Sequence, residues 1–338
     1  MSREKIKVIQ YGLGPIGTEC AKWCLRKPGL ELIGAVDIDP EKAGKPLEEV
    51  LGIQESTGIT VSKNLEQCLK KGKPEVALHT TQSSLKAVFP QLEQLLKAGI
   101  NVVSSTEELL VPELQNPELT SRLDQMASEN QVTVLGTGVN PGFVMDTLPL
   151  CLSSMCLEIK SIRVRRELDA GKRRLPLQKK VGSTLSVEEF NTLKKEKKIG
   201  HVGLVESMVL LLKGLGWRPD EVIETLDAMV AEQDLRTEFL TIRKGEVCGI
   251  KHIARALKGG KEIAAIDLRM YVGAPESFDL VEIEGTPPIK MKCIGGIHGD
   301  RATVAALVNA VPRVLEAASG VKTMSDLKLP AAFDAIHP

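Results

Sequence analysis

The feature that most constrains the fold is a glycine-rich turn that directly follows a short apolar strand. The segment IKVIQYGLGPIG, residues 6–17, carries Gly12, Gly14 and Gly17 in the spacing G-x-G-x-x-G. The first glycine permits a tight turn, the second lets the backbone approach a pyrophosphate, and the third lets the next helix pack closely on the sheet. The N-terminal amides of that helix, about residues 16–26, then hold the anion. The segment predicts a dinucleotide-binding unit.

An acidic residue supports the same interpretation. Asp37 ends a second apolar strand, LELIGAVDID, and lies 20 residues beyond Gly17, at the distance where a carboxylate binds the adenosine ribose. Such a carboxylate favours NAD over NADP because it repels a 2′-phosphate. Lys42 and Lys45 in the next loop would soften that preference toward acceptance of NADP. The alternative is a turn aspartate before Pro40.

The first 145 residues alternate between short apolar strands and amphipathic helices. Strands that are apolar throughout are typical of a parallel sheet buried on both faces. The predicted strands cover residues 7–11, 30–39, 59–61, 74–80, 100–105 and 131–138. The predicted helices cover residues 16–26, 64–71, 84–98, 117–129 and 143–155.

After residue 145 the pattern changes to that of a second domain. A strand is predicted at 159–168, and helices are predicted after Ser186 and at 203–215 and 219–232. From 236 to 294 apolar and polar residues alternate, which favours antiparallel hairpins.

We therefore predict an α/β fold with three segments. Residues 1–145 form a Rossmann domain with a doubly wound parallel sheet, and residues 146–298 form an antiparallel α+β domain for substrate binding and oligomerisation. Residues 299–338 carry a C-terminal helix that returns to the Rossmann domain.

Composition excludes several classes of protein. The chain has 44 basic and 44 acidic residues, so charge does not favour nucleic acid or an anionic membrane. No apolar stretch approaches the roughly 20 residues of a membrane-spanning helix, and the first strand begins too early for a signal peptide. The seven cysteines contain no CxxC and the five histidines are scattered. We expect a cytoplasmic protein with reduced thiols and no metal.

Ligands of open parallel sheets bind at the carboxyl ends of the strands. Thr80 and Thr81 follow one strand and either face the nicotinamide or satisfy their own backbone. His79 beside them has apolar neighbours and is typical of a core histidine. Asn140, in the turn after another strand, would bond the nicotinamide carboxamide or the substrate and also cap the next helix. The predicted cofactor contacts are Gly12, Gly14, Pro15, Ile16, Gly17, Asp37, Thr80, Thr81 and Asn140.

Glu107 and Glu108 follow the strand at 100–105 and are the candidate catalytic residues. A carboxylate near the nicotinamide and partly shielded from water is suited to proton transfer. It suits a reaction of amines, since it can deprotonate an ammonium group and later activate water. The alternative is that both are carboxylates at a helix N-terminus, where the dipole favours them.

The predicted second domain offers two polar motifs. Arg173 and Arg174 would hold a substrate carboxylate, although basic runs are usually solvated. His201 follows a glycine and opens an apolar helix, so it lies either in the pocket or in the core.

Taken together, the motifs YGLGPIG, AVDIDPEKAGK, NVVSSTEEL, VLGTGVNPGFVMDTLP and GHVGLVES resemble the 2,4-diaminopentanoate dehydrogenases and the related native amine dehydrogenases. The N-terminal domain of these enzymes is similar to that of dihydrodipicolinate reductase. The resemblance implies oxidative deamination of an amine with NAD(P), reversible as reductive amination of a ketone. It implies an essential glutamate at Glu107 or Glu108, and pocket residues Asn140, Phe143, Arg166, Asp169 and His201. Dihydrodipicolinate reductase itself fits poorly, because its paired histidines and its KxDAPSGT segment are missing.

The expected partners are a small amine or ketone and ammonia, and the expected assembly is a homodimer. The best single substrate is 2,4-diaminopentanoate, which would give 2-amino-4-oxopentanoate. Two alternatives stay open: an imine or carbonyl reductase of the dihydrodipicolinate reductase type, and a dinucleotide-binding sensor without turnover.

Overall fold

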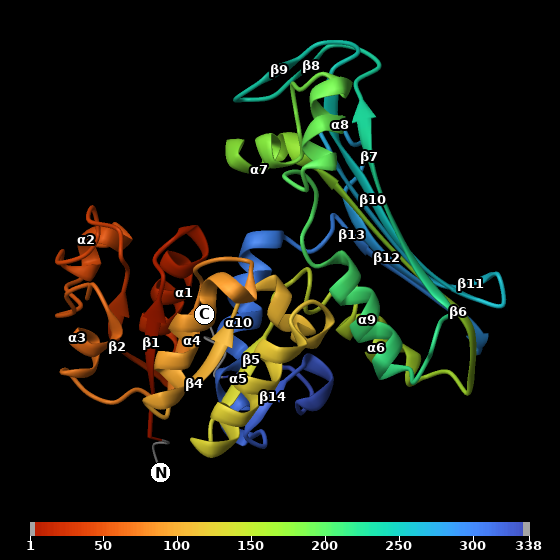
Figure 1. Ribbon diagram of the computed structural model, residues 1–338. Coiled ribbons are helices and arrows are strands. Elements are labelled where there is room, and N and C mark those ends of the chain that lie inside the picture. The colour runs from red at the N-terminus through yellow and green to blue at the C-terminus, as the bar shows by residue number, and fades with distance from the viewer. Residues whose placement is uncertain (1–3, 334–338) are drawn as a thin grey trace. The chain divides into compact units, whose positions relative to one another are not determined.

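The computed structural model describes residues 4–333, which divide into two compact units (Figure 1). Unit 1 comprises the chain up to Phe143 together with the chain from Gly299 onward, and unit 2 is Val144–His298. The last five residues of the predicted C-terminal segment lie outside the described range. In the described part of the chain, no helix is long and apolar enough to cross a membrane.

Unit 1 is built on a six-stranded sheet whose neighbouring strands are all parallel. This confirms the predicted Rossmann-type α/β sheet. In spatial order the strands are β14 (Gly320–Lys322), β5 (Thr133–Gly136), β4 (Asn101–Ser104), β3 (Val76–His79), β1 (Ile6–Tyr11) and β2 (Leu30–Val36).

Helices cover both faces of this sheet, as Figure 1 shows. α1 (Pro15–Arg26) and α10 (Gly299–Glu316) pack on one face, and α4 (Leu85–Lys97) and α5 (Pro117–Glu129) pack on the other. The buried residues of α4 recur at helical spacing and form one apolar stripe against the strands. They are Leu85, Val88, Phe89, Leu92, Leu95 and Leu96.

Two predicted elements of unit 1 differ from the structure. Within residues 59–61 only Thr60 forms an isolated bridge, to Pro46, and the sixth strand is β14 from the far end of the chain. The predicted helix at 143–155 begins later, as α6 (Thr147–Ser153) in unit 2, and its N-cap is Asp146 rather than Asn140. β14 has only three residues, and its pairing with β5 depends on contacts distant in sequence, so it leaves no periodic signal.

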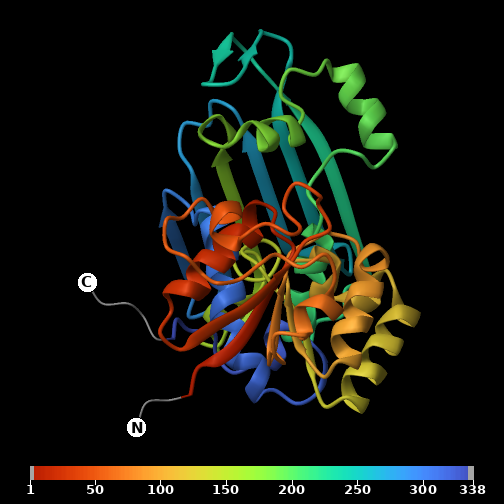
Figure 2. The ribbon, with the colours of Figure 1, turned by 90° about the vertical axis from the view of Figure 1, so that its left-hand side faces the viewer.

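Unit 2 contains a six-stranded mixed sheet, whose strands run side by side in Figure 2. We predicted antiparallel pairing throughout, and one pair differs: β6 and β11 are parallel. β6 comes much earlier in the chain than β11, so no hairpin joins the two strands and forces them to be antiparallel. α6 and α9 (Leu204–Gly214) contact the sheet and each other. The strand order is β13 (Ile289–Ile294), β12 (Phe278–Thr286), β6 (Glu158–Asp169), β11 (Lys261–Tyr271), β10 (Val247–Lys258) and β7 (Glu221–Val230).

The predicted helix at 219–232 is wrong: this stretch is the strand β7, paired antiparallel with β10. Its glutamate, leucine, alanine and methionine residues favour a helix locally. Pairing along β10 overrides that preference, because strand formation depends on tertiary context more than on intrinsic propensity.

The remaining elements are short. The helix predicted after Ser186 is present as α8, with the expected capping box to Glu189. The other elements are α2 (Leu47–Leu51), α3 (Leu65–Leu69), α7 (Leu175–Lys180), α8 (Val187–Lys195), the ribbon β8 (Leu235–Arg236) and β9 (Thr241–Ile242), and the 3-10 turns η1 (Glu107–Leu110), η2 (Pro112–Leu114), η3 (Ala170–Lys172) and η4 (Met324–Asp326).

Candidate active site

The three glycines of the loop after β1 are required for three different reasons. Gly12 has φ +89°, and a Cβ there would lie 2.6 Å from the Thr80 carbonyl oxygen. A Cβ on Gly17 would lie 1.9 Å from the Gly12 carbonyl oxygen. Gly14 has φ −70°, and its Cβ would meet no described atom within 4 Å. Neither backbone nor packing therefore requires glycine at position 14, and the open space beside it fits a bound pyrophosphate.

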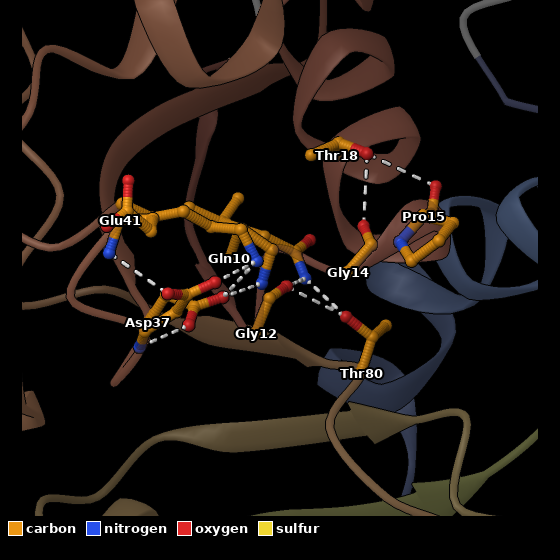
Figure 3. A network of polar contacts seen from close by, with 11 residues as sticks. Gln10, Gly12, Gly14, Pro15, Thr18, Asp37, Glu41 and Thr80 are labelled. Atoms are coloured by element: carbon orange, nitrogen blue, oxygen red, sulfur yellow. Dashed lines mark hydrogen bonds and ion pairs between the residues drawn. The ribbon is translucent and has the colours of Figure 1, made fainter.

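A buried glutamine in β1 holds this loop in shape (Figure 3). The Gln10 side chain is fully buried, and its Nε2 donates to the Gly12 carbonyl at 2.9 Å and to Thr80 Oγ1 at 2.8 Å. Thr80 Oγ1 donates in turn to the Gly12 carbonyl at 3.0 Å. Thr80 thus supports the loop rather than offering its hydroxyl to a ligand. Sequence reasoning missed Gln10, although a polar residue inside an apolar strand is a signal that marks it.

The Asp37 carboxylate is tied to the same loop, as Figure 3 shows. Its Oδ2 accepts a hydrogen bond from the Leu13 amide at 2.7 Å, and its Oδ1 accepts one from the Asp39 amide at 2.9 Å. The Lys42 ammonium lies 3.7 Å from Asp37 Oδ2. Asp37 is therefore held beside the glycine loop, where a carboxylate that binds ribose has to be, and Lys42 offsets part of its charge.

We expect Asp37→Ser to change the choice between the two cofactors. Removing the carboxylate removes its repulsion of a 2′-phosphate, so kcat/KM with NADP⁺ relative to NAD⁺ should rise about tenfold. Steady-state kinetics with both cofactors measures this ratio. Lys42→Ala is the matched control, because it removes the opposite charge from the same place and should lower the ratio. An unchanged ratio in Asp37→Ser would show that Asp37 does not select the cofactor.

His79 is a core histidine with both ring nitrogens bonded. Its Nδ1 is 2.9 Å from Ser104 Oγ and its Nε2 is 2.8 Å from Gln91 Oε1. Burial lowers the pKa of His79 to about 4, so the ring is neutral at physiological pH. Thr81 Oγ1 also donates to Gln91 Oε1, at 2.8 Å. The hydroxyls of both threonines therefore take part in contacts inside the protein.

The two adjacent glutamates of η1 have different surroundings. The Glu108 Oε2 accepts hydrogen bonds from the Leu85 amide at 2.7 Å and from Asn116 Nδ2 at 3.2 Å. Glu107 is partly buried, and no hydrogen bond or ion pair joins its carboxylate to another residue of the described chain. Only Glu107 thus presents a carboxylate that is not already engaged by the protein.

Asn140 lies in the turn after β5, at the same edge of the sheet as the glycine loop. Its Oδ1 is buried and has no hydrogen-bond partner within residues 4–333. Buried acceptors are nearly always satisfied, so this oxygen fits a donor of a bound molecule, such as a carboxamide. Phe143, also a predicted pocket residue, is partly buried where unit 1 ends.

In unit 2, Arg166 is occupied by a buried ion pair. It is 1% exposed, its Nη1 lies 2.6 Å from Asp279 Oδ1, and its Nη2 donates to the Ile297 carbonyl at 2.6 Å. Burial lowers the pKa of Arg166, and the charge of Asp279 opposes that shift. These contacts give Arg166 a structural role and count against its predicted role as a substrate ligand.

The segment after β6 is shaped by two side chains. The Asp169 Oδ1 accepts from the Gly171 amide at 2.9 Å. Gln178, fully buried, donates from Nε2 to the Arg173 carbonyl at 2.8 Å. The backbone that carries Arg173 and Arg174 is thus held by Gln178, which sequence reasoning did not single out. A glutamine next to a basic run gives no recognisable signal.

His201 lies in the turn before α9. Its amide donates to His252 Nδ1 at 3.3 Å, and the His252 Nε2 is 2.8 Å from a Glu224 carboxylate oxygen. The Nε2 of His201 is buried and, in the part of the chain that is described, has no hydrogen-bond partner. Burial, aided by nearby positive charges that include Lys180, lowers the pKa of His201 to about 3. The imidazole is therefore neutral at physiological pH.

The sheet edge of unit 1 fits a nicotinamide dinucleotide. It combines open space at Gly14, a carboxylate at Asp37 for the ribose, and a buried acceptor without a partner at Asn140. No group of three or more histidine, cysteine, aspartate or glutamate side chains within the described residues has the arrangement of a metal site.

Two models of known protein families match this chain. Residues 143–337 match the model of the 2,4-diaminopentanoate dehydrogenase C-terminal domain, and residues 6–136 match that of the dihydrodipicolinate reductase N-terminus. The chain belongs to the 2,4-diaminopentanoate dehydrogenase family. The resemblance seen in the sequence motifs is confirmed.

Individual members and relatives of the family span nearly the whole chain. The 2,4-diaminopentanoate dehydrogenase of Acetoanaerobium sticklandii is 30% identical over 98% of this chain and 95% of its own length. The amine dehydrogenase of Streptomyces virginiae is 22% identical over 97% and 98%. The structure of an amine dehydrogenase from Mycobacterium smegmatis is 23% identical, with a TM-score of 0.86 over 99% of both chains. That last likeness shows a shared fold.

Membership of the 2,4-diaminopentanoate dehydrogenase family makes this protein an NAD(P)-dependent oxidoreductase. The glycine loop and Asp37 at the strand ends are the parts of the chain that suit a nicotinamide dinucleotide. Its relatives are named for the oxidation of amines. This places the chemistry of the family on the CH–NH₂ group.

Proposed function

We propose that this protein oxidatively deaminates an amine with NAD⁺ and that Glu107 is its proton-transfer residue. The substrate that we favour is 2,4-diaminopentanoate, which would give 2-amino-4-oxopentanoate and ammonia. The observation that carries the proposal is a partly buried carboxylate without a protein partner among the described residues, at the sheet edge that carries the dinucleotide loop. The substrate named for the relative from A. sticklandii supports it.

The chemistry that we assign to Glu107 is proton transfer in two stages. Its carboxylate first takes a proton from the substrate ammonium and passes it to solvent, which leaves a neutral amine. A nicotinamide dinucleotide held by the glycine loop and Asp37 would supply the hydride acceptor for the amine carbon. Glu107 then removes a proton from the water that attacks the iminium carbon, and returns it to the nitrogen as the carbinolamine collapses to ketone and ammonia. The proton of the carbinolamine hydroxyl goes to the departing ammonia, so the net products are ketone, ammonium, reduced cofactor and one proton.

The other polar residues predicted from the sequence would bind the rest of the substrate. We assign the substrate carboxylate to Arg173 and Arg174, because guanidinium groups bind carboxylates with paired hydrogen bonds. The neutral His201, with a buried Nε2 that has no partner in the described chain, suits a hydrogen bond to the substrate. Asp169 would pair with the second amine. Cytoplasmic location and assembly as a homodimer stay predictions.

A substrate screen tests the proposal. We expect NADH to form with 2,4-diaminopentanoate at least about tenfold faster than with a simple amine that lacks a carboxylate, since one charged hydrogen-bonded contact contributes about 1.5–3 kcal/mol. Absorbance at the NADH band reports turnover over a panel of diamines, amino acids and monoamines.

The reverse reaction separates the alternatives. We expect NADH oxidation with a ketone only when ammonium is added. Ketone or imine reduction without ammonium would instead support a reductase of the dihydrodipicolinate reductase type. NADH binding without turnover on any member of the panel would support a sensor.

A further inference from the structure

Two adjacent glutamates open η1, and their side chains diverge. A 3-10 turn has about three residues per turn, so successive side chains point about 120° apart. Glu108 is directed at α4, whereas the Glu107 carboxylate forms no hydrogen bond or ion pair with a described residue. We propose that Glu108 is a positioning residue, which holds the turn so that Glu107 reaches the substrate amine. This proposal rests on the proposed function, in which Glu107 transfers the proton.

The Glu108 carboxylate serves as the N-terminal cap of α4. One oxygen, Oε2, accepts from the Leu85 amide at 2.7 Å, from Asn116 Nδ2 at 3.2 Å and from Ser84 Oγ at 3.3 Å. Ser84 occupies the N-cap position of α4, but its own side chain makes no capping bond. Glu108 supplies the missing acceptor from another element, with a charge that the helix dipole favours.

Further bonds join the same two segments. Thr106 Oγ1 donates to the Gln82 carbonyl at 2.8 Å, and the Glu108 amide donates to the Ser83 carbonyl at 3.3 Å. The chain that enters α4 and the chain that leaves β4 are therefore joined through both backbone and side chains. Because these bonds flank Glu107 in sequence, they fix the backbone on which it stands.

The opposite side of the turn packs directly on β5. A Cβ on Gly136 would lie 2.4 Å from the Leu109 carbonyl carbon, so glycine there allows η1 to approach the strand closely. The turn is thus held by α4 on one side and by β5 on the other. Removing the Glu108 carboxylate weakens the α4 side alone, because the bonds to Gln82 and Ser83 remain.

Within residues 4–333, the Glu107 carboxylate has no hydrogen bond or ion pair of its own to hold it in place. No described residue holds its carboxylate, so its position depends on the backbone of η1. Proton transfer requires donor and acceptor within hydrogen-bond reach. A displacement of about 1 Å is enough to cost about a hundredfold in rate.

We therefore expect Glu108→Ala to lower kcat about 10- to 100-fold, with the Kd for NADH unchanged within about twofold. Glu108→Gln should recover kcat to within about threefold, because its amide oxygen still accepts from the Leu85 amide. Glu118→Ala is the matched control: it removes an exposed carboxylate from the first turn of α5 and should leave kcat unchanged. All assays are run well below the measured Tm of each variant, so that lost stability does not lower kcat.

The result with Glu107→Gln separates the two proposals. If Glu107→Gln is inactive and Glu108→Ala turns over like the wild type, the positioning role is wrong and the proposed function stands. If Glu107→Gln retains turnover, the proposed function itself is wrong. If Glu108→Ala is insoluble, Thr106→Val removes the hydroxyl bond to Gln82 together with the bond that this hydroxyl accepts from Ser104 Oγ, and it has to lower kcat at unchanged NADH affinity for the proposal to hold.

Discussion

Replacing Glu107 by glutamine is expected to lower kcat about a thousandfold, because a positioned general base contributes about 10²- to 10⁴-fold. The substitution keeps the size of the side chain and removes its ability to take a proton. The carboxylate has no hydrogen bond or ion pair to another described residue, so the change removes no contact that holds the fold. Tm and the affinity for NADH should therefore stay at wild-type values.

Three measurements make this prediction specific. Single-turnover kinetics with saturating NAD⁺ and amine reports the chemical step, calorimetry reports Tm, and fluorescence titration reports NADH binding. Glu108→Gln is the control, since it makes the same change one residue along the chain, where the carboxylate caps α4. Turnover within a few-fold of wild type in Glu107→Gln would exclude proton transfer by this residue.

Replacing Gly14 by valine is expected to weaken NADH binding about a hundredfold or more without destabilising the protein. The backbone at Gly14 has φ −70° and ψ −174°, which any L-residue adopts, and a Cβ there meets no described atom within 4 Å. The new side chain therefore fills the space that the pyrophosphate would take. Valine is a poorer N-cap for α1 than glycine but also restricts the unfolded chain, so the two effects oppose each other and Tm should change little.

The neighbouring glycine provides the contrast. A Cβ on Gly17 would lie 1.9 Å from the Gly12 carbonyl oxygen, so Gly17→Ala displaces α1 from the loop and should lower Tm by several degrees, the size of change that about 1–3 kcal/mol of overpacking produces. Calorimetry and NADH titration on the two variants separate a ligand requirement from a packing requirement. Wild-type NADH affinity in Gly14→Val would mean that the cofactor does not pass over this loop.

Local signals in the sequence predicted the fold class of unit 1 and the position of its dinucleotide loop. The requirement for glycine at each loop position arises from a few nearby atoms, and each buried strand carries its own apolar run. Both features can therefore be recognised in the sequence alone. Signals of this kind failed where pairing depends on distant partners. The stretch at 219–232 has helix-forming residues but pairs with β10 as a strand, and the paired residues of β14 and β5 are 187 positions apart.

The same distinction between local and long-range determinants applies to the candidate site. By itself, the sequence determined the cofactor loop, the acidic residue beyond it and the pair of glutamates at a strand end, because their spacing from a strand is a local property of the chain. Only the tertiary structure decided which of the predicted residues are already engaged by the protein. Glu108 is bound to Leu85, Arg166 to Asp279 and Thr80 to Gln10. Those partners lie 23, 113 and 70 residues away in the sequence. A hydrogen bond between residues so far apart forms only in the folded protein, so no local sequence pattern predicts it.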